Sequence, residues 1–200
     1  MSGEQKRKWA AKFRIKYRDV FHLKQLYKTL YEWLRDKEWK DLNEEISNHF
    51  ETLYLERTDI YNNREYWIWW RLYNFPEESS NSFFRYRMDV DFHCVYIQDI
   101  EILHEGKKIQ CQKGEVEIKI LAFLEYDYAQ KWSKHPILTR MKELMIERVM
   151  HHDIDNHKKR LYRDAYFFQG AIKKYLLLKG FLPELELESF HPPKTFPSPT

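Results

Sequence analysis

The sequence predicts an α+β protein in which two amphipathic helices cover one face of a mostly antiparallel sheet. In several stretches before residue 129, apolar side chains alternate with polar ones, and this period of two is typical of strands with one buried face. In residues 22–37 and 136–178, apolar side chains instead recur every three or four positions, as in an amphipathic helix. The chain has 200 residues, of which 43% are hydrophobic and only five are glycine, so one sizeable core is expected.

The N-terminal part is predicted to contain a basic arm, a strand and a helix. Residues 1–12 form the arm. Residues 13–21 alternate apolar and basic side chains, which predicts a first strand with a basic outer face. Residues 22–37 carry leucine and aromatic side chains at helical spacing and predict the first helix. The acidic residues 38–50 are weakly periodic, and we interpret them as a connection.

The next segments predict a hairpin. Residues 52–61 and 65–75 are rich in aromatic and β-branched side chains, and the Asn-Asn-Arg sequence at 62–64 is suited to a turn. The following residues 76–82 are polar and are interpreted as a loop.

The centre of the sheet is predicted in residues 84–96, where apolar side chains occupy seven consecutive even positions. Residues 98–111 are interpreted as a short hairpin that turns at Glu105-Gly106. A second turn at 112–114 leads into the alternating residues 115–128. Together with the earlier segments, these predict an antiparallel meander of about six or seven strands.

The C-terminal part is predicted to be a long helix followed by an extended tail. Helical spacing runs from Pro136 nearly to Leu178, and the polar stretch 151–160 leaves open whether this is one helix or two. Residues 181–200 hold five of the seven prolines and are expected to be extended. We therefore expect a single domain over residues 13–180, between the basic arm and this proline-rich tail.

Three polar side chains of the central strand leave the same face of the sheet. Asp89, Asp91 and His93 are two residues apart, and Glu115 and Glu117 occupy the corresponding positions of a later strand. Carboxylates and imidazole suit a divalent metal or acid-base chemistry. The same face also carries cations, so a salt-bridged solvated surface and a polar binding surface remain alternatives. A metal site on this face requires the side chains of Arg85, Arg87 and Lys119 to point elsewhere.

Both faces of the strand at residues 65–75 carry aromatic side chains. Trp67, Trp69 and Arg71 share the face opposite Tyr66 and Trp70. One face can belong to the core, whereas the other must be covered by the chain itself or used. Stacking of nucleobases, a cavity for a hydrophobic ligand and a subunit interface are the uses considered.

Charge is spread unevenly along the chain. Residues 1–40 have a net charge of +7, and residues 41–60 have a net charge of −5. The N-terminal cations are candidates for contacting RNA, DNA or anionic lipid, or they form a solvated arm. They are Lys6, Arg7, Lys8, Lys12, Arg14, Lys16 and Arg18.

Signals of catalysis and of cofactor binding are sparse. His151 and Asp155 lie one helical turn apart and form a candidate metal pair without an obvious third ligand. There is no glycine-rich phosphate loop, Cys-x-x-Cys, Gly-x-Ser-x-Gly or His-Glu-x-x-His motif, which weighs against an enzyme, and no cofactor is expected. Two cysteines, no signal peptide and no apolar run long enough to span a membrane lead us to expect a cytoplasmic protein.

Several segments together carry a resemblance that covers most of the chain. They are "KYRDVFHLKQLYKTLYEWL", "EYWIWWRLY", "MDVDFHC", "KGEVEIKI", "KHPIL" and "LYRDAYFFQGAIKKYL". The sequence resembles an uncharacterised archaeal protein family without an assigned activity. The resemblance implies a cytoplasmic archaeal setting and transfers no functional residues.

Three functions are compatible with these patterns. The first is a non-catalytic interaction or assembly protein, with a protein partner or a second copy of the chain as the expected partner. The second is a hydrophobic-ligand carrier or related enzyme, because the element order looks like a helix-grip fold, in which a curved sheet wraps a long C-terminal helix. The third is a nucleic-acid-binding protein that uses the basic N-terminal region.

Overall fold

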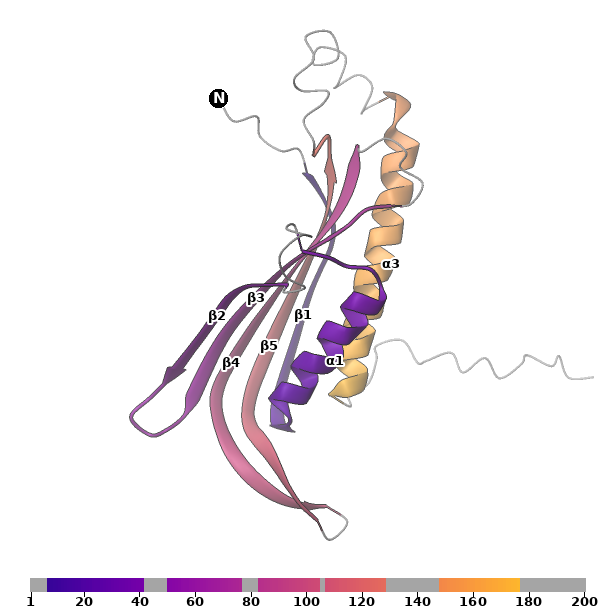
Figure 1. Ribbon diagram of the computed structural model, residues 1–200. Helices are drawn as coiled ribbons and strands as arrows, with labels where there is room; N and C mark the ends of the chain where they lie inside the picture. Colours follow the sequence, from indigo (N-terminus) through magenta and orange to yellow (C-terminus); the bar gives the residue numbers. More distant parts are fainter. Residues whose placement is uncertain (1–6, 42–49, 77–82, 105–106, 129–147, 177–200) are drawn as a thin grey trace, which may run out of the picture.

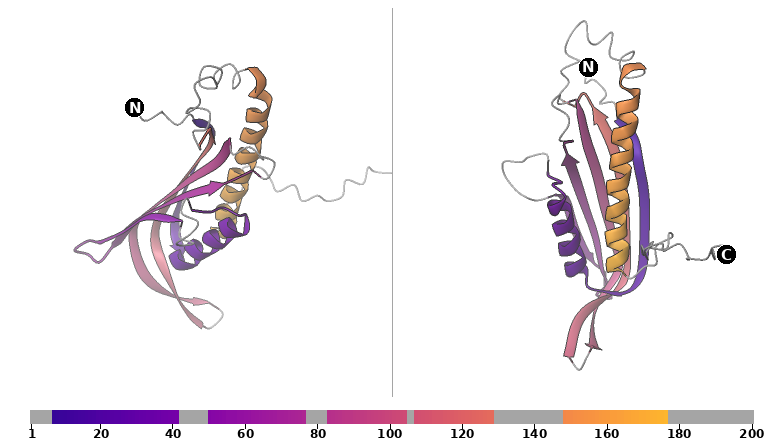
Figure 2. Two further views of the ribbon diagram at one scale, coloured as in Figure 1. Left: turned by 45° about the horizontal axis from the view of Figure 1, so that its top comes forward. Right: turned by 90° about the vertical axis from the view of Figure 1, so that its right-hand side faces the viewer.

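Five antiparallel strands form one curved sheet in the computed structural model, which describes residues 7–41, 50–76, 83–104, 107–128 and 148–176. The order across the sheet is β1-β5-β4-β3-β2. The two helices α1 and α3 lie together on one face, which we call the inner face, and the opposite face is the outer face (Figures 1 and 2). The strands are β1 (Arg7–Phe21), β2 (Glu51–Thr58), β3 (Arg64–Asn74), β4 (Phe84–His104) and β5 (Lys107–Tyr126), and the helices are α1 (Leu23–Asp36) and α3 (His151–Tyr175). The α+β prediction is confirmed.

Helix α1 begins directly after β1 because His22 caps it. The His22 side chain accepts a hydrogen bond from the Gln25 backbone N–H at 3.1 Å, which satisfies one of the free donors of the first turn. Leu26, Leu30 and Leu34 are fully buried at a spacing of four residues. The predicted helical stripe of residues 22–37 is therefore the stripe that packs into the core.

Helix α3 packs on β1 and β5 and also contacts α1. Its side chains that face the sheet are fully buried: Ile154, Leu161, Ala165, Phe168 and Ile172. From the sheet, the even-numbered residues Met88 to Cys94 of β4 are buried in the same core as these helix side chains, as the alternating pattern predicts. Among the described residues, side chains thus fill the space between α3 and the sheet.

The sheet has fewer strands than the sequence indicated, because β4 does not end near residue 96 and the expected turn at 112–114 does not occur. Residues 84–96 and the first half of the expected hairpin are one strand, β4, and its second half continues through residues 112–114 into β5. The pairing shifts register between Val95 and Gln98, where Tyr96 has a φ of 56°. Gly114 lies against this bulge, so a bent but unbroken pair of strands replaces the predicted turn.

The ends of two elements also differ from the sequence-based bounds. β1 begins at Arg7, so residues 7–12 belong to the sheet and not to a separate basic arm, because they pair with β5 as far as Glu125. The polar residues 151–160 are the first turns of α3 rather than a break between two helices. The expected helical part from 136 to 147, most of the connection 38–50, the loop residues 77–82 and the tail 181–200 lie outside the described residues.

No helix in the described part of the chain is long and apolar enough to cross a membrane.

Candidate functional site

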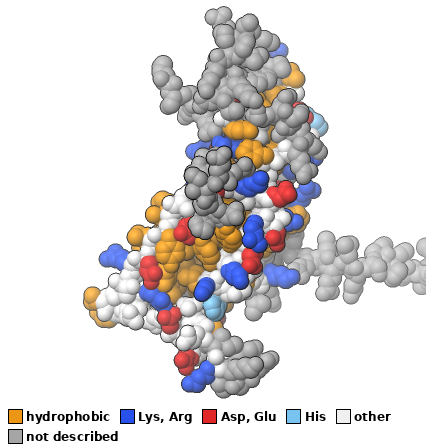
Figure 3. All heavy atoms as spheres, viewed as in Figure 1, with side chains coloured by type: hydrophobic (Ala, Val, Ile, Leu, Met, Phe, Trp, Pro, Cys, Tyr) orange, Lys and Arg blue, Asp and Glu red, His pale blue; other side chains and the backbone are white. Residues whose placement is uncertain are grey.

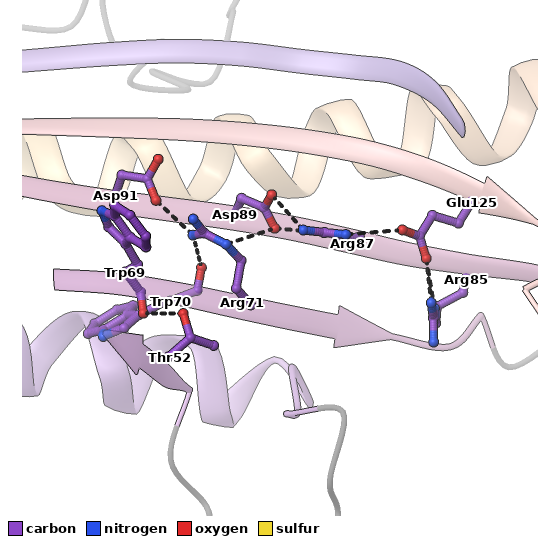
Figure 4. A network of polar contacts seen from close by, with 9 residues as sticks. All are labelled: Thr52, Trp69, Trp70, Arg71, Arg85, Arg87, Asp89, Asp91 and Glu125. Atoms are coloured by element: carbon purple, nitrogen blue, oxygen red, sulfur yellow. Dashed lines mark hydrogen bonds and ion pairs between the residues drawn. The ribbon is translucent and has the colours of Figure 1, made fainter. Parts of the chain in front are cut away.

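The polar side chains of β4 lie on the outer face, where arginines from β3 and β4 hold them (Figure 4). Arg87 donates from Nε and Nη2 to the two carboxylate oxygens of Asp89 at 2.8 and 3.0 Å. Nη1 of Arg71 donates to Oδ1 of Asp91 at 2.7 Å, and its Nε lies 3.8 Å from Oδ1 of Asp89. Both aspartates are therefore already bound by guanidinium groups.

The other members of the predicted polar set are paired in the same way. His93 Nε2 lies 2.8 Å from Oε1 of Glu65. Lys16 lies 2.7 Å from Glu115. Glu117 accepts from Arg14 at 2.5 Å and lies 3.1 Å from Lys119, and the hydrogen bond from Arg14 lowers the pKa of the Glu117 carboxyl. Apart from Glu117 with Lys119, which both lie on β5, these pairs join neighbouring strands and so depend on the register of the sheet.

The geometry that a metal site on this face requires is therefore not met. Arg87 and Lys119 bind Asp89 and Glu117 instead of pointing away from them. Within the described ranges, no group of three or more His, Cys, Asp or Glu side chains is placed to hold a metal ion. His151 and Asp155 do approach each other, with 3.5 Å between Nδ1 and Oδ2, but both side chains are exposed and no third ligand joins them in the described residues.

Aromatic and aliphatic side chains of β2 and β3 form a second feature of the outer face. Leu53 is paired with Trp69, and Leu55 with Trp67, so the four side chains lie on one side of the hairpin. We call this set, Leu53, Leu55, Trp67 and Trp69, the apolar strip. Leu55 and Trp69 are 51% and 41% exposed. The two helices lie on the other face, so neither of them covers the strip (Figure 2).

Polar neighbours border the apolar strip and fix its tryptophans. The rings of Trp67 and His93 are stacked, with 5.2 Å between centroids and 19° between planes. The guanidinium carbon of Arg71 lies 5.5 Å from the Trp69 centroid, and the same arginine is held by Asp91. The predicted combination of Trp67, Trp69 and Arg71 on one face is thus present, and its tryptophans are positioned by ring and ion-pair contacts.

β1 is an edge strand of the sheet, and its basic side chains alternate with apolar ones. Arg14 and Lys16 pair with Glu117 and Glu115 of the neighbouring strand β5. Lys12 and Arg18 lie on the same side of the strand and are exposed. Arg7 instead lies over the ring of Phe123, at 4.9 Å from the centroid. Lys8 is exposed in β1, whereas Lys6 lies outside the described residues. Internal pairing leaves less of this charge for phosphate groups than the sequence indicated.

A pocket on the inner face was not predicted from the sequence. It lies between the first turns of α1 and the β2–β3 hairpin and has a volume of about 370 Å³. Its lining comes from four separate elements, so no local motif could have shown it. The residues are Leu23, Lys24, Tyr27, Tyr54, Arg64, Tyr66, Ile68 and Gln112. This position differs from the space beneath α3, where a helix-grip carrier would hold its ligand and where the described side chains are closely packed.

Comparison with protein families, with curated proteins and with solved structures gives no match for this chain.

Proposed function

We propose that this protein is a non-catalytic interaction protein that assembles with a second copy of itself through β2 and the apolar strip. The observation that carries the proposal is the position of this strip at β2, which among the described strands is paired on one side only. Exposed apolar side chains beside free backbone hydrogen-bonding groups favour pairing with another strand.

The two edges of the sheet differ in a way that supports β2 as the contact. β1 carries a cation at every outward-facing position from Lys12 to Arg18, and charged side chains of this kind oppose strand addition. β2 instead has three apolar residues in succession, Leu53, Tyr54 and Leu55, of which the last two are each 51% exposed. An edge of this composition gains from backbone hydrogen bonds and apolar cross-strand contacts with a second strand.

The sequence of β2 also fits an antiparallel copy of itself. When Tyr54 stands opposite the same residue of a second chain, Leu53 of one chain stands opposite Leu55 of the other. The two apolar strips then form one continuous surface across the joined sheets. A register centred on Leu55 would place Leu53 opposite Arg57 and would break this continuity. We therefore expect the contact to be centred on Tyr54.

Mass measurement by light scattering over a wide concentration range tests the proposal. We expect a species of twice the chain mass of 24.9 kDa that dissociates on dilution. Leu55→Lys places a charge within the apolar strip and should shift the protein to the monomer. Phe167→Lys is the matched control, because Phe167 of α3 is 55% exposed, similar to Leu55, but lies on a different element. This control should leave the mass unchanged.

Hydrogen exchange locates the contact independently of mass. The backbone amides of β2 should exchange more slowly at high protein concentration, and those of β1 should not change. A monomer at every concentration, or a dimer that Leu55→Lys leaves intact, contradicts the proposal.

A further inference from the structure

The pocket beside α1 combines an apolar wall with a charged rim. Figure 3 shows hydrophobic side chains gathered between the β2–β3 hairpin and α1, with charged side chains around them. A volume of about 370 Å³ is at the lower end of the range of small-molecule sites. The pocket therefore suits a compact ligand.

Three tyrosines and two aliphatic side chains form the wall of the pocket. Tyr27 lies on α1, Tyr54 on β2 and Tyr66 on β3, and the last two rings are 6.1 Å apart. Leu23 and Ile68 complete the apolar lining. Flat aromatic walls of this kind favour a ligand with an aromatic body, because ring contacts add to the burial of apolar area.

Hydrogen bonds behind the wall hold two of these tyrosines in place. The Tyr27 hydroxyl donates to Oε2 of Glu51 at 2.7 Å, and the Tyr66 hydroxyl donates to Oε1 of Glu56 at 3.1 Å. Burial raises the pKa of Tyr66 to about 12. The hydrogen bond to Glu56 adds to this increase, and the charge of Arg64 opposes it. Both carboxylates thus accept hydrogen bonds from the wall and are not themselves part of the lining. A wall that is already ordered loses little conformational entropy on binding.

Two of the described lining residues are charged, Lys24 and Arg64, and both are cations. An ion pair with Asp99 orients Arg64, whose planar group has five N–H donors in total. Gln112 accepts from the Leu23 backbone N–H at 3.0 Å and donates to Asp99 at 3.2 Å, which fixes the end of the pocket next to Arg64. The lining therefore presents positive charge at the rim and aromatic surface inside.

We infer that this pocket binds a compact aromatic carboxylate, with the ring between the tyrosines and the carboxylate at Lys24 and Arg64. The inference does not require self-assembly, because the pocket lies on the inner face and the apolar strip on the outer face; Tyr54 alone belongs both to the pocket lining and to the centre of the proposed contact.

Calorimetric titration of the full chain with three probes of one shape tests the ligand class. The probes are 2-naphthoate, which is negatively charged, 2-naphthamide, which is neutral, and 2-naphthylmethylammonium, which is positively charged. We expect the carboxylate to bind most tightly and the ammonium most weakly. Absence of saturable binding by the carboxylate, equal affinity for the amide, or a preference for the ammonium would overturn the inference.

Two pairs of variants test the site. Lys24→Gln and Arg64→Gln should each weaken binding of 2-naphthoate by about two- to fivefold, as expected for partly exposed charge pairs. Lys28→Gln, one helical turn along α1, and Arg57→Gln, on the same hairpin, remove equivalent charges outside this lining and should leave the affinity unchanged. Equal losses in a variant and its control would show only general attraction and would overturn the inference.

Chemical shifts in NMR spectra distinguish the pocket from the exposed tryptophans. Addition of 2-naphthoate should shift ring signals of Tyr27, Tyr54 and Tyr66. Shifts confined to Trp67 and Trp69 would place the probe on the outer face and would overturn the inference.

Discussion

The guanidinium group of Arg85 donates from Nε at 2.9 Å and from Nη2 at 2.6 Å to one carboxylate oxygen of Glu125 (Figure 4). The two residues are direct partners on β4 and β5, and their side chains are only 11% and 2% exposed. The guanidinium carbon also lies 4.5 Å from the ring centroid of Tyr73 and 4.8 Å from that of Tyr128. A buried charge pair thus joins the central strands on the outer face.

Loss of the Glu125 charge should strongly destabilise the protein. Glu125→Gln leaves Arg85 buried without its anion, and breaking such a pair from one side costs about 3–5 kcal/mol. Urea unfolding at neutral pH measures the change in the free energy of unfolding. Glu115→Gln is the control, because its partner Lys16 is 54% exposed and a pair of this kind contributes less than about 1 kcal/mol. Similar losses for the two variants would contradict the assignment of Arg85 and Glu125 as a buried pair.

Two glycine-to-alanine substitutions should change stability in opposite directions. A Cβ at Gly114 would lie 2.5 Å from Cδ1 of Ile97 and 3.0 Å from the backbone oxygens of Val95 and Tyr96. Gly114→Ala must displace this bulge, and we expect a loss of about 1–3 kcal/mol in the free energy of unfolding. A Cβ at Gly170, inside α3, meets no atom of the described residues within 4 Å.

Gly170→Ala should therefore stabilise the protein by roughly 0.5–1 kcal/mol, because alanine loses less backbone entropy than glycine in a helix. Urea unfolding of both variants tests the pair of predictions. An unchanged free energy of unfolding in Gly114→Ala would contradict the first prediction, because it would mean that the bulge can move without cost.

The Cys94 thiol should be unreactive in the folded protein. Cys94 is fully buried on β4, and burial raises the pKa of its thiol to about 12. Since the thiolate is the reactive form, a chromogenic disulfide reagent at about pH 8 should label this thiol only after unfolding. The Cys111→Ser variant isolates the signal of Cys94. Equal labelling rates with and without denaturant would show that β4 is accessible.

The stabilising effect of Glu117 should depend on pH. The hydrogen bond from Arg14 lowers the pKa of the Glu117 carboxyl in the folded protein, so the ionised form contributes stability above the ordinary carboxyl pKa. This contribution disappears as the pH falls through the lowered value in the folded state. Glu117→Gln should therefore cost up to about 1 kcal/mol at neutral pH and nothing once the carboxyl is protonated in both states.

Urea unfolding of Glu117→Gln and of the original protein at neutral and at acidic pH measures the difference. Glu32→Gln removes a carboxylate from the exposed pair with Lys28, which is separated by 3.8 Å, and should have little effect at either pH. A cost of Glu117→Gln that grows toward acidic pH would contradict the sign of the pKa change.

Local patterns were sufficient for much of the fold. The seven alternating residues from Phe84 to Tyr96 predicted the central strand, and the leucine stripe at residues 22–37 predicted helix α1. The strand count was too high, because a polar stretch with glycine at 112–114 is typical of a turn. Here Gly114 instead allows the close approach of the Tyr96 bulge within a continuous pair of strands.

The candidate sites needed more than local patterns. Asp89, Asp91 and His93 were correctly predicted to share a face, but the sequence did not show that arginines and Glu65 bind them. The Arg85–Glu125 pair and the pocket beside α1 were both missed. Their members come from strands and helices far apart in the chain, and no spacing motif links such residues.

The sequence by itself determined which side of each regular strand and helix is apolar, because side-chain direction follows the backbone period within a few residues. Only the tertiary structure decided which charges meet across the strands, that the apolar strip lies on the outer face at an edge of the described sheet, and that three tyrosines line a pocket. These relationships depend on strand order, register and the bulge at Tyr96, which are set by packing between distant segments.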